Sequence, residues 1–393
     1  MHPSATSRNA GLDRPIAPNL HYSCRWRSHN PHGHALKAST IALLLPLSDR
    51  LRDAGEALRD GFLTAFYDQP ASGRPQIGIY DVGTDAADAY RRAIAEGATH
   101  VVGPLSKEHV GAIRKISDPR VTTLALNTLT DDEPVPRGFF QFGLSPEDES
   151  RAVAERLLAE GKTSGAALVI GSEWGTRVLA SFQSRFQTGG GKLVVHRPFA
   201  NTDTDFTPSV DEILGFEPSQ KRHDALVSLL KIPLQFAPRR RDDVEFVFFA
   251  GPPVSGRLMR QQFKFHYAPD LPIYATSDVF DPNPVANQDL DGVAFVDMPW
   301  MIGTDPTLEG LRTSAARVWP GSARIHGRLF AMGIDAYRLI QALRNTESRP
   351  LISLAGATGL LSIDASGRVH RTLEWAIIGT DGSPHALPAL ATT

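Results

Sequence analysis

The stretch Ile41-Ala-Leu-Leu-Leu-Pro-Leu47 is an unbroken apolar run near the start of a 393-residue chain. Gly55 to Tyr67 follows it with apolar residues at three- and four-residue spacing, and Gln76 to Val82 is read as a second strand. A short continuous apolar run is typical of a strand covered on both faces, whereas the wider spacing is typical of an amphipathic helix. Strand, helix and strand in this order predict the start of a parallel sheet.

The same alternation continues outward along the chain in two similar series. Further strands are predicted at residues 100–105, 121–126 and 139–144, and then at 166–171, 192–198, 244–250, 273–276 and 292–296. Helices are predicted at residues 85–96, 107–116, 145–160, 174–186, 206–214, 224–230 and 255–266. We therefore expect an α/β protein with two lobes, each built on a doubly wound parallel sheet.

The last third of the sequence does not begin a third domain. Helices are predicted at 308–318 and 328–344, and a hairpin at 359–364 with 369–379. The long apolar helix at 328–344 is expected to pack back on the first lobe, so that the chain crosses a hinge several times. The predicted division is a disordered or wrongly started tail at 1–39, a first lobe at 40–145 plus about 301–345, and a second lobe at 146–300 plus about 346–393.

Composition excludes several classes of function. Lysine and arginine total 41 against 43 aspartate and glutamate, which argues against a protein built mainly to bind nucleic acid or an anionic membrane. No apolar stretch of about 18 residues is present. The single cysteine, Cys24, excludes an internal disulfide and any cysteine-only metal site. We expect neither a signal peptide nor a lipidation motif in the chain as given, so any membrane anchor lies outside it.

No catalytic, cofactor or metal motif is found. Gly189-Gly190-Gly191 lacks the lysine and serine or threonine of a phosphate loop and is read as a helix stop. The acidic residues at predicted helix starts are explained by the helix dipole. These residues are Asp85, Asp88, Glu147, Asp148 and Glu149.

Polar residues follow several of the predicted strands, where ligands bind in open parallel sheets. The candidates for a ligand crevice are Ser48, Ser106, Asn127, Thr128, Ser172 and Trp174. Strand ends at Gly251-Pro252 and Thr276-Ser277-Asp278 reach the same edge. Serine, threonine and asparagine are also ordinary helix caps, and the sequence leaves both interpretations open.

Three adjacent arginines, Arg239, Arg240 and Arg241, precede Asp242 and Asp243 just before a predicted central strand. Such a run is either a self-neutralising surface turn or a recognition patch, since guanidinium groups pair bidentately with carboxylates. We expect these arginines to pair partly with local acids and at least one to brace the fold. A docking role is the alternative.

Several segments together resemble the C-terminal domain of the LpoA family, the penicillin-binding protein activators. The segments are 43–48, 54–62, 102–105, 124–127, 142–149, 238–277, 289–292, 297–300, 331–337, 356–364 and 373–375. The resemblance covers about residues 40 to 380. The 238–300 region carries the part that is specific to the family.

The resemblance implies a type I periplasmic-binding-protein fold used as a regulator and not as an enzyme. It further implies that the chain binds a bifunctional penicillin-binding protein, stimulates its transpeptidase, and works in the periplasm in association with the outer membrane. Long members carry a helical-repeat domain before this one, and residues 1–39 are too short for it. The alternative, which shares the fold, is a periplasmic solute-binding receptor for an amino acid or amide.

Overall fold

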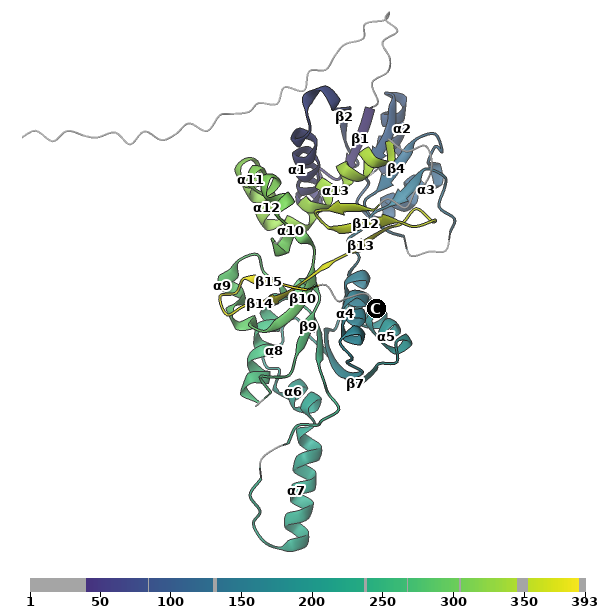
Figure 1. Cartoon of the computed structure of the whole chain (residues 1–393). Helices are drawn as coiled ribbons and strands as arrows, with labels where there is room; N and C mark the ends of the chain where they lie inside the picture. The colour runs from purple at the N-terminus through teal and green to yellow at the C-terminus, as the bar shows by residue number, and fades with distance from the viewer. Residues whose placement is uncertain are drawn as a thin grey trace, which may run out of the picture. The chain divides into compact units, whose positions relative to one another are not determined.

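The computed structural model describes residues 40–83, 85–129, 133–236, 239–266, 268–303, 305–344 and 353–388. The predictions made for Cys24 and for the tail at 1–39 fall outside these residues. Two large sheets and one small sheet make up the described fold (Figure 1).

The first large sheet has five parallel strands in the order β2-β1-β3-β4-β5. Its strands are β1 (Thr40–Leu45), β2 (Gln76–Asp81), β3 (Ala98–Val102), β4 (Thr122–Ala125) and β5 (Phe139–Gln141). Its helices are α1 (Arg52–Asp68), α2 (Ala86–Ala95) and α3 (Lys107–Ile116).

The apolar run that begins the fold is buried on both sides, as its composition predicts. Ile41, Leu43 and Leu45 pack with α1 and with α13 (Gly327–Arg344), whereas Ala42 and Leu44 pack with α2 and α3 on the other face. Side chains alternate between the two faces of a strand, so an unbroken apolar run is required when both faces are covered. The sheet is therefore doubly wound.

The helices α1 and α13 come unusually close together. A Cβ built on Gly333 would lie 2.2 Å from the carbonyl oxygen of Leu58, and one on Gly61 would lie 1.9 Å from that of Phe330. Only glycine allows the two backbones this approach. The long helix of the last third therefore returns to the first sheet, as the sequence predicts.

The second large sheet has seven strands in the order β15-β14-β10-β9-β8-β6-β7. Neighbouring strands from β7 to β10 run parallel, and β14 and β15 are antiparallel additions at one edge. The strands are β6 (Ser164–Ile170), β7 (Lys192–Phe199), β8 (Val247–Ala250), β9 (Ile273–Ala275), β10 (Val293–Asp297), β14 (Glu374–Ile378) and β15 (Pro384–Leu387).

Helices cover both faces of this sheet as well. Ala167 and Val169 of β6 pack with α4 (Pro146–Ala159) and α5 (Glu173–Thr188), whereas Ala166 and Leu168 face α6 (Thr207–Leu214) and α8 (Pro253–Phe265). The remaining helices are α7 (Phe216–Leu230), α9 (Pro284–Asn287), α10 (Pro299–Ile302), α11 (Glu309–Val318) and α12 (Pro320–Ile325). The predicted α/β class with two doubly wound sheets is confirmed.

Within the described residues the chain enters the second large sheet after β5, leaves it after β10, and returns to it after β13, a strand of the small sheet. The third passage corrects the predicted hairpin. β12 (Gly359–Ile363) does pair with β13 (Val369–Thr372), and β11 (Leu354–Gly356) completes a three-stranded sheet. β14, however, pairs with β10 of the other sheet, because the chain changes partner at Leu373. The predicted lobe boundaries remain a proposal.

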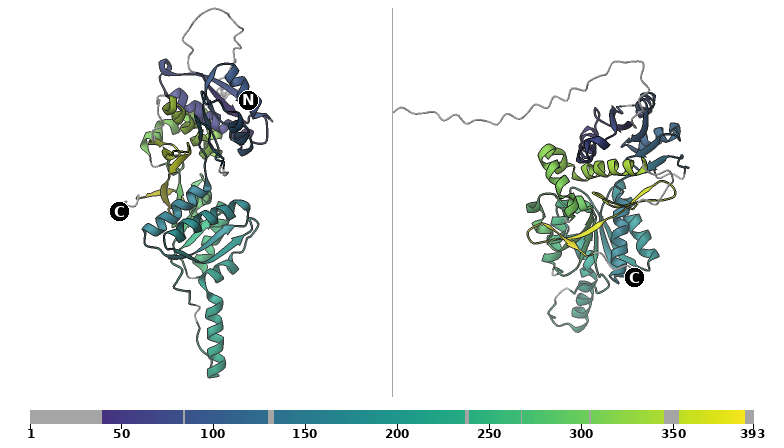
Figure 2. Two further views of the ribbon diagram at one scale, coloured as in Figure 1. Left: turned by 90° about the vertical axis from the view of Figure 1, so that its right-hand side faces the viewer. Right: turned by 45° about the horizontal axis from the view of Figure 1, so that its top comes forward.

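A second correction concerns the insertion before β8. The helix predicted at 224–230 begins eight residues earlier, at Phe216, because Gly215 adopts a left-handed conformation that ends α6 and starts α7. Of its residues only Ser219 is buried. α7 and its return segment extend away from the sheet in every view (Figures 1 and 2).

Candidate functional site

The predicted residues of the first sheet lie at its carboxyl edge and are occupied locally. The Ser106 hydroxyl accepts a hydrogen bond from the His109 amide at 3.2 Å and caps α3. Asn127 donates to the Leu105 carbonyl at 2.8 Å and accepts from the amide of Thr128. The cap interpretation thus accounts for Ser106, and loop bracing accounts for Asn127.

Ser48 follows β1, and its side chain forms a hydrogen bond with Asp81 at the end of β2. Partial burial of Asp81 would raise its pKa, but hydrogen bonds from Ser48 and the Leu47 amide hold that pKa below its usual value. None of Ser48, Ser106, Asn127 and Thr128 lines the pocket described next.

At the carboxyl edge of the second sheet the structure brings Ser172 and Trp174 together in a cavity of about 480 Å³. Its lining residues are Ile170, Ser172, Trp174, Asn201, Gly251, Pro252, Pro253 and Asp278. Ser172 also caps α5, since its hydroxyl accepts from the Gly175 amide at 3.1 Å. The pocket lies where open α/β sheets bind ligands, and its role as a ligand site stays a prediction.

Two of the pocket's polar residues are absent from the predicted set. Asn201 follows β7, and its isolated position after a strand gives no signal that singles it out. Asp278 belongs to a strand end that the sequence does indicate. Burial raises the pKa of Asp278, with Asp297 adding to this effect and Arg328 opposing it.

Where the chain enters and leaves the second sheet lies a group of charges that we call the junction cluster: Glu149, Asp297, Arg328 and Arg371. Glu149, Asp297 and Arg371 are buried, and Arg328 is partly buried. The members come from α4, the end of β10, the start of α13 and β13, so each of the three passages contributes. Arg328 donates to Asp297 at 3.2 and 2.6 Å and to the carbonyl of Ser277 at 2.8 Å. The amide of Ser277 in turn donates to Glu149 at 3.0 Å.

Glu149 corrects the helix-dipole interpretation of the first-turn acids. Its side chain is buried, and burial, with a smaller contribution from Asp278 and Asp297, raises its pKa to about 7. Arg371 and Arg328 oppose this shift. The dipole still accounts for the neighbouring acids, but Glu149 belongs to the junction cluster.

Arg371 is buried, and none of its three side-chain nitrogens has a hydrogen-bond partner among the described residues. Burial lowers the pKa of its guanidinium, whereas Glu149 is the strongest of the acids that raise it. Arg371 and Glu149 therefore attract each other through their charges but form no hydrogen bond. Sequence spacing could not reveal this pair, since it joins residues 222 positions apart.

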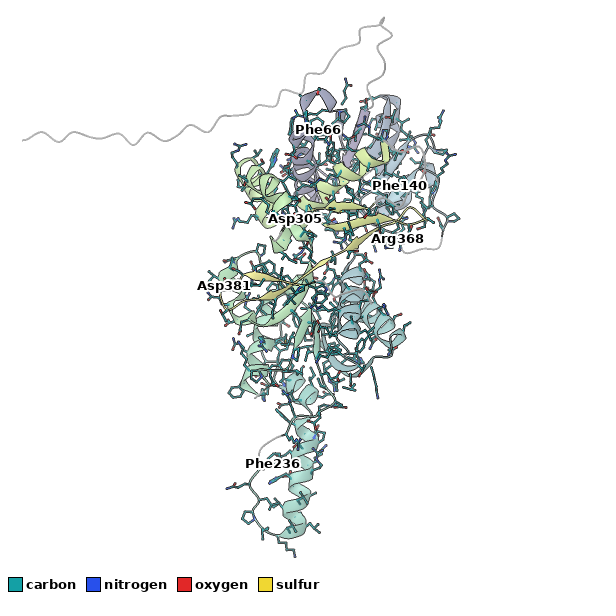
Figure 3. All side chains as sticks on the ribbon, in the orientation of Figure 1. Phe66, Phe140, Phe236, Asp305, Arg368 and Asp381 are labelled. Atoms are coloured by element: carbon teal, nitrogen blue, oxygen red, sulfur yellow. The ribbon has the colours of Figure 1, made fainter. Side chains whose placement is uncertain are left out.

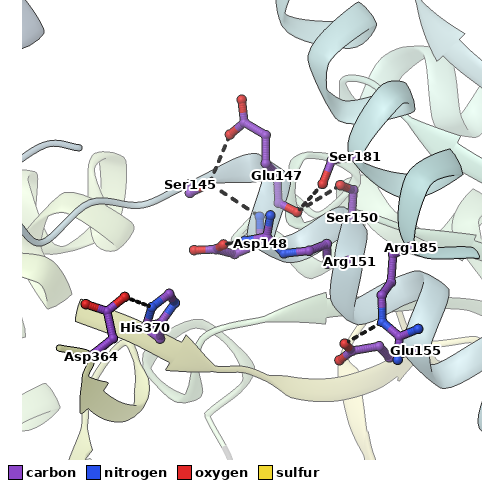
Figure 4. Close-up of polar contacts among 10 residues, drawn as sticks. All are labelled: Ser145, Glu147, Asp148, Ser150, Arg151, Glu155, Ser181, Arg185, Asp364 and His370. Atoms are coloured by element: carbon purple, nitrogen blue, oxygen red, sulfur yellow. Dashed lines mark hydrogen bonds and ion pairs between the residues drawn. The ribbon is translucent and has the colours of Figure 1, made fainter. Parts of the chain in front are cut away.

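The start of α4 shows how local sequence positions this region (Figure 4). Ser145 accepts from the Asp148 amide at 3.3 Å, and Pro146 occupies the first helical turn, as predicted. Arg177 of α5 donates to Glu147 at 2.8 Å. These contacts fix the helix start from which Glu149 points inward.

The three arginines lie at the base of the α7 insertion and each has an acidic neighbour. Arg240 forms a bidentate pair with Asp270 at 2.8 Å, and Arg241 donates to Asp243 at 2.8 Å. The Arg239 Nη2 atom lies 3.8 Å from the Asp242 Oδ2 atom. These contacts support a bracing role, which remains a proposal.

Among the described residues there is no group of three or more metal-ligating side chains. No described helix is both long enough and apolar enough to cross a membrane.

Comparison with known proteins decides the family. The model of the family described as "LppC putative lipoprotein" matches residues 34–380. The chain belongs to the LppC family. The match covers both predicted series and most of the last third.

Relatives of this LppC chain carry a shared name. Proteins named penicillin-binding protein activator LpoA from Vibrio antiquarius and Photobacterium profundum are both 29% identical to it, over 90% and 87% of its length. The chain covers 62% and 56% of those proteins. It therefore spans about three fifths of the length of these curated relatives.

Solved structures share the fold. The C-domain of LpoA from Haemophilus influenzae, described as a regulator of PBP1A, has a TM-score of 0.67 and 24% identity, and covers 89% of this chain and 100% of its own. Full-length LpoA from the same organism has a TM-score of 0.66 and 25% identity, and the match covers 89% of this chain and 59% of that one. A protein from Rhodospirillum rubrum described as "a putative branched-chain amino acid ABC transporter" has a TM-score of 0.69 and 17% identity, and the match covers 89% of this chain and 100% of that one. The LppC chain therefore has the periplasmic-binding-protein-like fold.

Proposed function

We propose that this chain is a non-enzymatic regulator of peptidoglycan synthesis, which binds a bifunctional penicillin-binding protein and stimulates its transpeptidase. The observation that carries the proposal is the LppC match over residues 34–380, together with relatives named as activators over most of this length. The proposal includes a periplasmic location with outer-membrane association, which the description of the family as a "putative lipoprotein" supports.

The chemistry of the site supports a regulator. The polar residues at the sheet edges are engaged as caps and braces, such as Ser106, Asn127 and Ser172.

A solute-binding receptor for an amino acid or amide remains the alternative, because transporter proteins share the fold. One observation speaks for it: the pocket lined by Ser172, Trp174 and Asp278 at the ligand-binding edge. The names of the more similar relatives favour the regulator. The two functions differ in what they bind, so they can be separated directly.

The experiment uses the purified chain and a bifunctional penicillin-binding protein from the same organism. Pull-down should recover the synthase, and the synthase should form more peptide crosslinks from lipid-linked precursor when the chain is present. A catalytically inactive synthase, with its transpeptidase serine replaced, is the control for crosslinking. Unchanged crosslinking with a fully active synthase would contradict the proposal.

A further inference from the structure

The end of α7 exposes a cluster of large apolar side chains. Leu226, Leu229 and Leu230 are 50%, 77% and 51% exposed, and Ile232, just after the helix, is 52% exposed. We call these four residues the α7 tip. Spacings of three and four residues place the leucines along one side of the helix. Soluble proteins rarely gather apolar side chains on a projecting element unless the element binds something.

The insertion is built to hold this tip in place. His223 stacks against Phe236 of the return segment with ring centroids 4.4 Å apart, and its Nε2 lies 3.3 Å from the Leu234 carbonyl oxygen. At the base, the Arg239 amide donates to Ser219 at 3.3 Å and the Arg241 amide to the Leu214 carbonyl at 2.8 Å. These contacts tie α7 to its return segment, and Leu226, Leu229 and Leu230 remain at least half exposed beside them (Figure 3 labels Phe236).

Two cations that are unpaired in the described part of the chain lie beside the tip, and the nearby acid Asp224 is already hydrogen-bonded to Gln220 and His223. Arg222 lies four residues before Leu226, on the same side of the helix, and Lys231 directly follows Leu230. Both are exposed, and neither has an ion-pair partner among the described residues. The other nearby cation, Lys221, is already paired with Glu217. A partner that covers the leucines would therefore meet two cations that need acidic groups.

From this we propose that the α7 tip is the docking surface for the partner synthase. In the complex, the tip occupies an apolar groove on the folded synthase, and carboxylates of the synthase flank that groove. The inference rests on the proposed function. An amphipathic helix that places residues at i, i+3 and i+4 into a groove is a recurring mode of recognition. Two cations at the rim of the apolar contact add complementarity to an acidic groove and speed association.

Two other occupants fit the charges less well. A second copy related by a two-fold axis would bring Arg222 and Lys231 of both chains to the same interface, where like charges repel. A membrane surface is bound by helices with a wide apolar face and many basic residues. The α7 tip offers four apolar side chains and two unpaired cations.

The test compares a variant with L226Q, L229Q and L230Q against the wild-type chain. Glutamine is nearly as good a helix former as leucine, so α7 should persist, which circular dichroism checks. A matched control carries V285Q, V318Q and L360Q, three other exposed apolar positions on different elements. We expect synthase binding, measured by biolayer interferometry, to weaken at least about tenfold in the first variant and less than about twofold in the control.

A second variant tests the charges. R222E with K231E should weaken binding and flatten its dependence on salt, since the attraction to carboxylates is lost. If the wild-type chain binds and stimulates the synthase and the glutamine variant binds equally well, the inference is wrong while the proposed function stands. If the wild-type chain does not bind, both fail.

The other occupants give contrary results of their own. We expect analytical ultracentrifugation to show no tip-dependent dimer of the wild-type chain. A wild-type dimer that the glutamine variant lacks would assign the tip to self-association and overturn the inference. Co-sedimentation with vesicles of phosphatidylethanolamine and phosphatidylglycerol must likewise be negligible for the wild-type chain. Tip-dependent binding to such vesicles would assign the surface to the membrane.

Discussion

Arg328, near the start of α13, forms a bidentate pair with the buried carboxylate of Asp297 at the end of β10. α13 packs on the first sheet and β10 belongs to the second, so the pair joins the elements of the two sheets. Burial alone would lower the pKa of Arg328, but Asp297 raises it. The pair therefore connects α13 to β10 at a point where the chain leaves the second sheet.

Replacing Asp297 with asparagine should destabilise the fold strongly. Removing one partner of a buried pair leaves the other charge uncompensated, at a cost of about 3 to 5 kcal/mol. Urea unfolding followed by circular dichroism measures the loss. R120Q breaks the exposed pair with Asp118 and serves as the control, for which we expect no measurable change. A D297N variant as stable as the wild type would contradict a structural role for the pair.

Glu149 should make stability fall as pH rises from about 4.5 to about 7. Its folded-state pKa of about 7 lies above the usual glutamate value of 4.5, so in this window the folded state binds more protons than the unfolded state. The protonated Glu149 side chain contributes its full stabilisation below pH 4.5, and this contribution is lost as the pH rises to about 7. The total loss of unfolding free energy is on the order of 3 kcal/mol at most. E149Q keeps an acceptor for the Ser277 amide and should flatten this part of the profile.

Four charged residues near Glu149 also influence its pKa, namely Asp278, Asp297, Arg328 and Arg371. D278N is therefore measured alongside, because burial raises the pKa of Asp278 in the same direction. Melting temperatures in a series of buffers give the slopes. An E149Q profile that runs parallel to the wild-type profile would exclude Glu149 as its source.

The contact between α1 and α13 gives a matched pair of glycine substitutions. G333A places a Cβ 2.2 Å from the Leu58 carbonyl oxygen and should cost about 1 to 3 kcal/mol or more, because backbone cannot easily move aside. G111A in α3 meets no atom within 4 Å and should stabilise by up to about 1 kcal/mol. Urea midpoints compare them. Equal midpoints would show that the two helices are not in tight contact.

Much of this fold could be predicted from the sequence because the signals are local. The strand predicted at Ile41 to Leu47 is observed at Thr40–Leu45 with both faces buried, and Ser145 with Pro146 starts α4 as expected. The switch of partner at Leu373 could not be read, because alternation of side chains does not say which strand is the neighbour. The early start of α7 was missed since it depends on the left-handed backbone of Gly215.

The candidate site was predicted only in part. Ser172 and Trp174 follow a strand and do line the pocket, because the carboxyl ends of parallel strands share one edge. Glu149 and Arg371 gave no local signal of burial. Their proximity depends on how the chain passes between the sheets, which no short pattern encodes.

Solute binding can be tested by thermal melting with a panel of amino acids, amides and muropeptides. A ligand at 100 times its dissociation constant adds about 2.7 kcal/mol of stability. For a regulator we expect no shift with any amino acid or amide. A shift that disappears in W174A, with the fold of that variant intact, would favour the receptor alternative and place its ligand in the pocket.

Titration of the chain into a crosslinking reaction of the bifunctional synthase tests the proposed function most directly. The crosslinked fraction of the muropeptide products is measured at fixed synthase and substrate, with an equal amount of denatured chain as the control. We predict that this fraction rises with added chain and saturates, and that the L226Q, L229Q and L230Q variant needs at least about tenfold more protein for the same effect. A crosslinked fraction that stays constant up to saturating chain would contradict a role in stimulating the transpeptidase.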